Sequence, residues 1–230
     1  MLSFVVPAYN EEKYLAVTLA SIHEAARAVG EPYEIVVADD ASTDATATIA
    51  REGGARVVQV HKRQIAGTRN AGAAAATGDM LFFVDADTQV NVDVVRGALE
   101  ALRAGAVGGG AAVRFADGPR WLHGFMVVFV PAFRWAKFAA GCFVFARRDA
   151  FEAAGGFDEA YYASEEIHLS RALARRGRFV VLREAVTTSA RKTQTHSFLA
   201  MSRLLLMIAL RGPAGLKSRK HTAFWYPEKR

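Results

Sequence analysis

The sequence predicts an α/β fold in which a central, mostly parallel sheet is flanked by helices, with a helical tail at the C-terminus. Two observations favour this fold. Short apolar runs typical of buried strands alternate with helical patterns through the first half of the chain. The 230 residues are 52% hydrophobic and 23% charged, a globular balance with enough length for one sizeable core. No linker separates the halves, so we expect one domain.

The expected elements of the first half follow in a regular order. Asn10 is placed to cap a helix with Glu11 and Glu12 in its first turn, and Gly30 and Pro32 end that helix. Residues 2–6, 33–38, 56–60 and 80–84 are expected to form strands, and residues 43–52, 66–76 and 92–103 the next helices.

The second half is less regular. We expect strands over residues 106–115, 141–146 and 179–182, and helices over residues 164–176 and 197–210. Residues 121–135 form an aromatic-rich segment that is either a core helix or an interfacial one.

The net charge of +6 suits an anionic partner such as a nucleotide diphosphate, nucleic acid or an acidic lipid headgroup, although the charge taken alone favours a solvated basic face. The basic residues form no known nucleic-acid recognition motif, so we expect no nucleic-acid partner. Cys142 is the single cysteine, which excludes an intrachain disulfide and a thiolate metal cluster.

Carboxylates stand at the ends of two expected strands, where ligands of parallel sheets bind. Asp85 and Asp87 follow residues 80–84 with one alanine between them, so they could share a divalent ion, Mn²⁺ or Mg²⁺; the alternative is a solvated turn. Asp39 and Asp40 follow residues 33–38, and one of them could accept a hydrogen bond from a base N–H.

Two further stretches allow both a structural and a functional interpretation. Ser42 or Thr43 could cap the next helix. The small residues from Gly67 to Gly72 permit close backbone approach, and Arg69 among them could meet a phosphate. A sugar nucleotidyltransferase would instead carry its glycine-rich loop directly after the first strand, where this chain has none.

Taken in order, these pieces resemble glycosyltransferase family 2, whose members have the GT-A fold. The resemblance runs over roughly residues 2–190 and is carried by the series Val5-Val6-Pro7-Ala8-Tyr9-Asn10-Glu11, Val37-Ala38-Asp39-Asp40-Ala41-Ser42-Thr43-Asp44, Gly67-Thr68-Arg69-Asn70-Ala71-Gly72, Phe83-Val84-Asp85-Ala86-Asp87, Gly155-Gly156-Phe157-Asp158-Glu159 and Glu165-Glu166. It implies a GT-A domain over residues 1–195, with a nucleotide-binding half (1–115) and an acceptor half (116–195). Residues 196–230 would be a helical, basic extension of that domain.

The resemblance also implies roles for single residues. The donor would be a UDP- or GDP-sugar and the acceptor a hydroxyl group. Asp40 and Asp39 would read the base, Asp85 would face the ribose or the metal, and Asp87 would bind the metal. The remaining implied contacts are Pro7, Ala8, Tyr9, Glu11, Arg69 and Ala86 with the nucleotide-sugar, and Gly155, Gly156, Phe157 and Asp158 with the sugar and acceptor.

The family commonly has Glu-Asp where this chain has Glu165-Glu166. By register, Glu166 takes the place of the catalytic Asp and would act as general base in an inverting transfer, with Glu165 as the alternative. The structural interpretation is that Ser164 caps a helix whose first turn carries two glutamates favoured by the helix dipole.

Residues near the C-terminus carry weaker signals. His196 could be a third metal ligand or a phosphate contact, and Arg191 and Lys192 could steady the diphosphate, although each could also be simply exposed. The aromatic segment 121–135 and the apolar helix 198–210 with its basic tail could meet a membrane surface or a lipid-linked acceptor.

The N-terminus shows no secretion signal, so a cytoplasmic enzyme is expected, with peripheral contact at the inner face of the membrane as a further hypothesis. Two rival functions remain beside the glycosyltransferase. One is a sugar nucleotidyltransferase. The other is a catalytically silent module that binds a nucleotide-sugar, which is suggested by Glu165-Glu166 in place of the family's Glu-Asp.

Overall fold

The computed structural model describes residues 1–116, 139, 141–162 and 164–189. The aromatic segment 121–135, the helix expected over residues 197–210, the basic residues Arg191 and Lys192, and His196 lie outside these residues. The predictions made for them therefore remain predictions.

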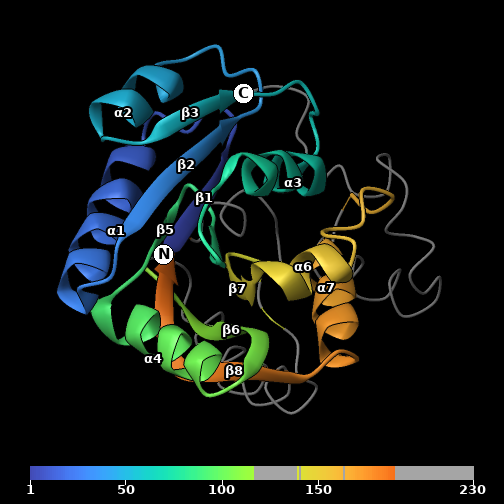
Figure 1. The fold of residues 1–230 in the computed structure, drawn as a ribbon. Helices are drawn as coiled ribbons and strands as arrows, with labels where there is room; N and C mark the ends of the chain where they lie inside the picture. Colours follow the sequence, from blue (N-terminus) through green and yellow to red (C-terminus); the bar gives the residue numbers. More distant parts are fainter. Residues whose placement is uncertain (117–138, 140, 163, 190–230) are drawn as a thin grey trace, which may run out of the picture.

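Four parallel strands form the first half of the sheet, in the order β3-β2-β1-β4. They are β1 (Leu2–Ala8), β2 (Tyr33–Asp39), β3 (Arg56–Gln59) and β4 (Met80–Val84). The connecting helices are α1 (Leu15–Val29), α2 (Thr46–Glu52) and α3 (Ile65–Ala75). Figure 1 shows β3, β2 and β1 side by side. Because β2, β1 and β4 are parallel neighbours, the polar residues that follow their carboxyl ends lie at one edge of the sheet, as the sequence predicts.

The second half makes the sheet mixed. β7 (Phe143–Arg147) runs antiparallel to both β4 and β6 (Ala106–Phe115), while β6 and β8 (Arg178–Thr188) are parallel. The remaining elements of this half are β5 (Thr88–Gln89), α4 (Val92–Arg103), α6 (Arg148–Ala153) and α7 (Glu165–Ala174).

The sheet curls so that its far edge returns to the end of β4. The full strand order is β3-β2-β1-β4-β7-β6-β8-β5. β5 follows β4 in the chain after a short turn, yet it is the last strand of the sheet and pairs with β8. Register shifts interrupt the pairing of β6 with β8, and such irregularities bend a sheet. As a result, the amide N–H of Ser189 donates to the carbonyl oxygen of Asp87 (3.2 Å).

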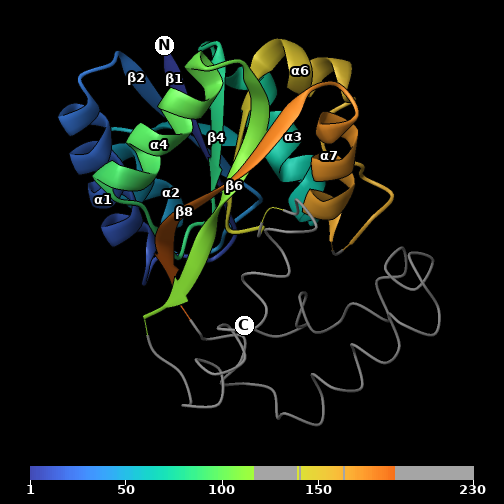
Figure 2. The same cartoon turned by 90° about the horizontal axis from the view of Figure 1, so that it is seen from below.

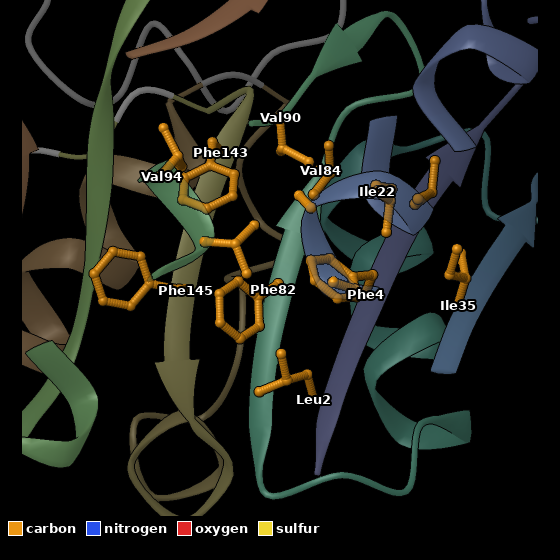
Figure 3. Close-up of a cluster of buried hydrophobic side chains, with 14 of the residues drawn as sticks. Leu2, Phe4, Ile22, Ile35, Phe82, Val84, Val90, Val94, Phe143 and Phe145 are labelled. Carbon is orange, nitrogen blue, oxygen red and sulfur yellow. The ribbon is translucent and has the colours of Figure 1, made fainter. Parts of the chain in front are cut away.

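Helices cover both faces of the sheet. Figure 2 shows α1 and α2 on one side and α3, α6 and α7 on the other. The strands alternate accordingly: Phe4 and Phe82 join the core beneath α1 and α4, whereas Val5 and Phe83 join the core beneath α3, α6 and α7. Figure 3 shows the first of these clusters, with the rings of Phe4 and Phe82 side by side at 5.0 Å between centroids.

The helix starts differ from the sequence prediction. α1 begins at Leu15 and not at Asn10, and its N-cap Tyr14 makes no side-chain hydrogen bond. α2 begins at Thr46 after Ala45, so neither Ser42 nor Thr43 caps it. The physical reason is tertiary: the side chains expected to cap the helices bond instead to the neighbouring loop.

Three further differences concern the second half. Ser164 precedes α7 in the left-handed region (φ 62°) and forms no side-chain cap, which contradicts the capping interpretation. β8 extends to Thr188, well past the expected end at residue 182, because β6 and β5 supply partners for its second part. The short elements β5 and α6 have no clear signal in the sequence.

α3 packs so closely on the sheet that it needs glycine at position 72. A Cβ atom on Gly72 would lie 2.5 Å from Cγ1 of Val5, a buried β-branched side chain that cannot move aside. We therefore expect Gly72→Ala to lower the free energy of unfolding by about 1–3 kcal/mol, measured by urea titration.

Gly97→Ala in α4 is the matched control, because a Cβ atom there would meet its nearest neighbour at an ordinary 3.5 Å. The gain in helix propensity should stabilise this variant by up to about 1 kcal/mol. Equal effects of the two substitutions would contradict the close approach of α3 to β1.

Candidate active site

The loops after β1 and β2 are locked together above the sheet edge. The amide N–H of Asn10 donates to the hydroxyl of Ser42 (3.0 Å), and the Asn10 side-chain oxygen accepts from the amide of Thr43 (2.8 Å). The amide of Glu11 donates to the hydroxyl of Thr46 (2.7 Å). These bonds hold Asn10 in the left-handed region (φ 53°) and replace its predicted role as a helix cap.

The residues predicted to line the nucleotide pocket lie along this edge. Pro7 and Ala8 are buried at the end of β1, Tyr9 is half-buried just beyond them, and Glu11 is buried in the loop that follows. The guanidinium carbon of Arg63 lies 3.9 Å from the centre of the Tyr9 ring, within the range of a cation–π contact.

Asp39 and Asp40 are both buried, and both carboxylates are hydrogen-bonded within the protein. Asp39 accepts from the amide of Ser42 (3.1 Å) and from the side-chain amide of Gln59 (2.8 Å). The two oxygens of Asp40 accept from the amide of Lys62 (2.7 Å) and from the amide of Gln64 (3.2 Å), and the second also accepts from the hydroxyl of Thr68 (3.0 Å). Asp40 thus fixes the loop between β3 and α3.

The turn from Asp85 to Asp87 is fixed by its backbone. The amide of Asp85 donates to the carbonyl of Cys142 (3.1 Å), and the carbonyl of Ala86 accepts from the hydroxyl of Thr18 (2.8 Å). The Asp87 carbonyl is held by Ser189 at the end of β8. Both aspartate side chains are therefore attached to a rigid turn, and both residues are half-buried.

Arg69 lies at the centre of the site, although the sequence predicts it beside a phosphate. Only 1% of its side chain is exposed. One terminal nitrogen donates to Glu165 (2.5 Å), and the other donates to Asp85 (2.6 Å) and to the carbonyl of Gly141 (2.6 Å). Burial alone would lower the pKa of Arg69, but the charges of Asp85 and Glu165 outweigh it and place the pKa above its usual value, so Arg69 stays charged.

The two neighbouring glutamates have different surroundings. Glu165 is buried and paired with Arg69, which makes it part of the ion-pair cluster. The carboxyl group of Glu166 lies against Gly141, where an added Cβ atom would be 3.2 Å from Cδ of Glu166. Burial of its carboxyl group, and next the charge of Glu165, raise the pKa of Glu166 to about 8. A carboxyl group that binds a proton near neutral pH has the property required of a general base.

The loop predicted to shape the acceptor site is bound to α3. Gly155 and Gly156 adopt positive φ angles, and the next residue, Phe157, is buried. The backbone N–H of Phe157 donates to the side chain of Asn70 (2.9 Å), whose amide group donates back to the carbonyl of Phe157 (2.8 Å). Asp158 is exposed at the tip of the loop.

The sequence singled out most of these residues but missed how they connect. Gly141, Gln64 and Tyr161 were not predicted as part of the site, and they form links through backbone carbonyls or side-chain amides. A glycine or a glutamine in such a role leaves no pattern in a single sequence. His196 lies outside the described residues, so its predicted place near the site stays a prediction.

Asp85 and Asp87 fit a hard divalent cation by their chemistry. Within the described ranges, no three His, Cys, Asp or Glu side chains are grouped so that they could hold a metal ion. Mg²⁺ in nucleotide-dependent enzymes is usually held by one or two carboxylates together with substrate phosphates, and two carboxylates on one rigid turn match that donor set.

Loss of the buried cation at position 69 would leave the carboxylates of Asp85 and Glu165 unpaired. We therefore expect Arg69→Met to lower the free energy of unfolding by about 3–5 kcal/mol, measured by urea titration. The control is Arg103→Met, which removes an exposed ion pair with Glu31 and should cost less than about 1 kcal/mol. Similar losses of unfolding free energy in the two variants would show that the buried Arg69 ion pairs stabilise the protein no more than an exposed pair does.

Comparison with known proteins supports the relationship that the sequence suggests. The family model described as Glycosyl transferase family 2 matches residues 3–155. An undecaprenyl-phosphate 4-deoxy-4-formamido-L-arabinose transferase from Enterobacter sp. (strain 638) is 35% identical over 94 residues, which are 38% of this chain and 29% of that protein. The chain thus spans less than a third of the length of this relative.

Solved structures share the fold at low sequence identity. The mannosyltransferase PcManGT from Pyrobaculum calidifontis, solved with GDP-Man and Mn²⁺, aligns with a TM-score of 0.69 and 20% identity over 100% of this chain and 65% of that chain. S. aureus TarS 1–349, solved with UDP-GlcNAc, aligns with a TM-score of 0.65 and 21% identity over 87% of this chain and 60% of that chain. These neighbours confirm the predicted GT-A-like fold, and the family model matches well over half of the residues, so the chain belongs to glycosyl transferase family 2.

Proposed function

We propose that the chain is an inverting glycosyltransferase that moves a sugar from a UDP- or GDP-sugar to a hydroxyl acceptor. One observation carries this proposal: Arg69 joins Asp85 at the end of β4 to Glu165 at the start of α7, next to a glutamate whose pKa is raised to about 8. The turn from Asp85 to Asp87, which is suited to a metal-bound diphosphate, thereby lies near the carboxyl group of Glu166, which is suited to remove a proton.

The surroundings of the two glutamates assign them different roles. Glu165 already serves as counter-ion to Arg69, so proton transfer at its carboxylate would leave the buried cation less well paired. Glu166 is not held by that ion pair and is the better base. In the proposed reaction it accepts the proton of the acceptor hydroxyl, whose oxygen then bonds to the anomeric carbon as the bond to the nucleotide diphosphate breaks on the opposite face.

Asp87, with Asp85, is proposed to hold the divalent cation, Mn²⁺ or Mg²⁺. A bound cation would supply neutralisation of the charge on the departing diphosphate. PcManGT was solved with GDP-Man and Mn²⁺, and TarS with UDP-GlcNAc. These complexes support testing both GDP-sugars and UDP-sugars as donors here. Calorimetric titration of UDP and GDP, with and without Mn²⁺, distinguishes them.

The nature of the acceptor is proposed only by class. The Enterobacter relative is named as an undecaprenyl-phosphate 4-deoxy-4-formamido-L-arabinose transferase, which supports a lipid-linked acceptor as one candidate. Among the described residues, no helix is long and apolar enough to cross a membrane. The nucleotide-binding half (1–115), the acceptor half (116–195) and contact with a membrane surface stay predictions.

Removal of the Asp87 carboxylate should abolish metal-dependent turnover because it leaves the proposed cation only Asp85, which is already paired with Arg69. We expect Asp87→Ala to release nucleoside diphosphate from a nucleotide-sugar panel at a rate at least about a hundredfold below that of the wild type. Asp79→Ala, at the other end of β4 and 86% exposed, is the matched control and should retain activity. Full Mn²⁺-dependent release by Asp87→Ala would refute the metal role.

Glu166→Gln keeps the shape of the side chain but removes the base. Turnover should fall by about a hundredfold or more, whereas binding of the nucleotide should change little. The wild-type rate should also rise with pH through about 8, because Glu166 must lose its proton to act, and the variant should lose that rise.

Glu165→Gln provides the contrast. It should destabilise the protein through the loss of the Arg69 ion pair, in addition to any effect on turnover. If Glu165→Gln instead stays folded and loses the pH-dependent step while Glu166→Gln retains it, the base is Glu165.

A further inference from the structure

Gln64 connects the donor side of the site to the loop after α6. It lies at the N-cap position of α3 and is buried, with 8% of the residue exposed. Its backbone amide donates to Asp40 (3.2 Å), and its side-chain nitrogen donates to the carbonyl oxygens of Glu159 (2.5 Å) and Tyr161 (3.0 Å). A single residue therefore bonds to segments from opposite halves of the chain.

The orientation of the Gln64 amide follows from its partners. A carbonyl oxygen can only accept a hydrogen bond, so two carbonyls around one amide group require its NH₂ end to face them. The amide is thus a double donor in a buried position, where an unmade hydrogen bond is costly. The NH₂ group of Gln64 satisfies both carbonyls at once.

The connection continues into α7. The ring of Tyr161, which is buried, stacks on the ring of His168 at 3.8 Å between centroids. His168 lies in the first turns of the helix that begins with Glu165 and Glu166. From Asp40, the path runs through Gln64 to Tyr161 and His168, and so to the helix that carries the proposed base.

We propose that Gln64 is a positioning residue that holds the loop of residues 157–162 and the start of α7 in register with the nucleotide site. This inference rests on the proposed function. It assigns Gln64 no contact with the reacting atoms: its two side-chain bonds set where the base stands relative to the bound donor. Misplacement of a reacting group by about 1 Å can cost up to about a hundredfold in rate.

A second link between the same loops offers a control. Nζ of Lys62 forms an ion pair with Glu159 (3.3 Å), and both side chains are about half exposed, at 47% and 44%. Exposed pairs of this kind contribute little to stability. Lys62→Met therefore removes one connection between the same loops without leaving any buried group unpaired.

The test compares Gln64→Met, which keeps the length of the side chain but has no donor, with Lys62→Met and the wild type. We expect Gln64→Met to bind UDP or GDP with Mn²⁺ within about twofold of the wild-type Kd by calorimetry. Its release of nucleoside diphosphate from the nucleotide-sugar that the wild type uses should fall by about ten- to a hundredfold. Lys62→Met should match the wild type in both.

Hydrogen exchange tests the physical link without any ligand. In the free protein, peptides covering residues 157–162 should exchange faster in Gln64→Met than in the wild type, whereas peptides from β1 and β2 should not. Gln64→Asn, which keeps the amide donor on a side chain one carbon shorter, replaces Gln64→Met if the latter fails to fold. Unchanged exchange at residues 157–162 would overturn the positioning role.

The outcomes separate this inference from the proposed function. Unchanged turnover in Gln64→Met, or a weakening of nucleotide binding in proportion to the loss of turnover, would overturn the positioning role while leaving the glycosyltransferase intact. If the wild type binds neither nucleotide and releases none, the proposed function fails, and the role of Gln64 in it fails with it.

Discussion

The buried guanidinium of Arg69 is the constraint on which the site depends. A charge without access to water must be paired, and here the partners come from the end of β4, from the start of β7 and from the start of α7. The planar fork of arginine satisfies all three in fixed directions. The positions of Asp85 and of Glu165 are therefore linked, because the same Arg69 guanidinium binds both carboxylates.

This constraint gives two adjacent and chemically identical residues different chemistry. Glu165 is paired with Arg69 and acts as a structural counter-ion, whereas Glu166 lies against Gly141 with a raised pKa. The environment thereby separates a carboxylate that pairs with a cation from one that can bind a proton. The Asp-to-Glu departure in this chain is compatible with that division, since the longer side chain still begins at the same turn of α7.

The loops after β1 and β2 show a second constraint, which is the satisfaction of backbone groups. Asn10, Ser42 and Asp40 each use their side chains to bind backbone amides of a neighbouring segment. This explains why the helix caps expected at Asn10 and at Ser42 are wrong: the same polar atoms that could cap a helix locally bind amides of a more distant segment. Rigid loops result, and Gln64 extends the same kind of bonding from the nucleotide side to the loop after α6.

The sequence alone determined the order of strands and helices from β1 to β4 and the meeting of their polar ends at one edge, because hydrophobic periodicity and βαβ connections are local properties. The bounds of β4, α4 and β6 agree with those expected from that periodicity. The sequence leaves open what Arg69 pairs with, which glutamate lies outside that ion pair, and how β5 reaches β8. These depend on contacts between residues far apart in the chain, such as Arg69 and Glu165, which no local pattern encodes.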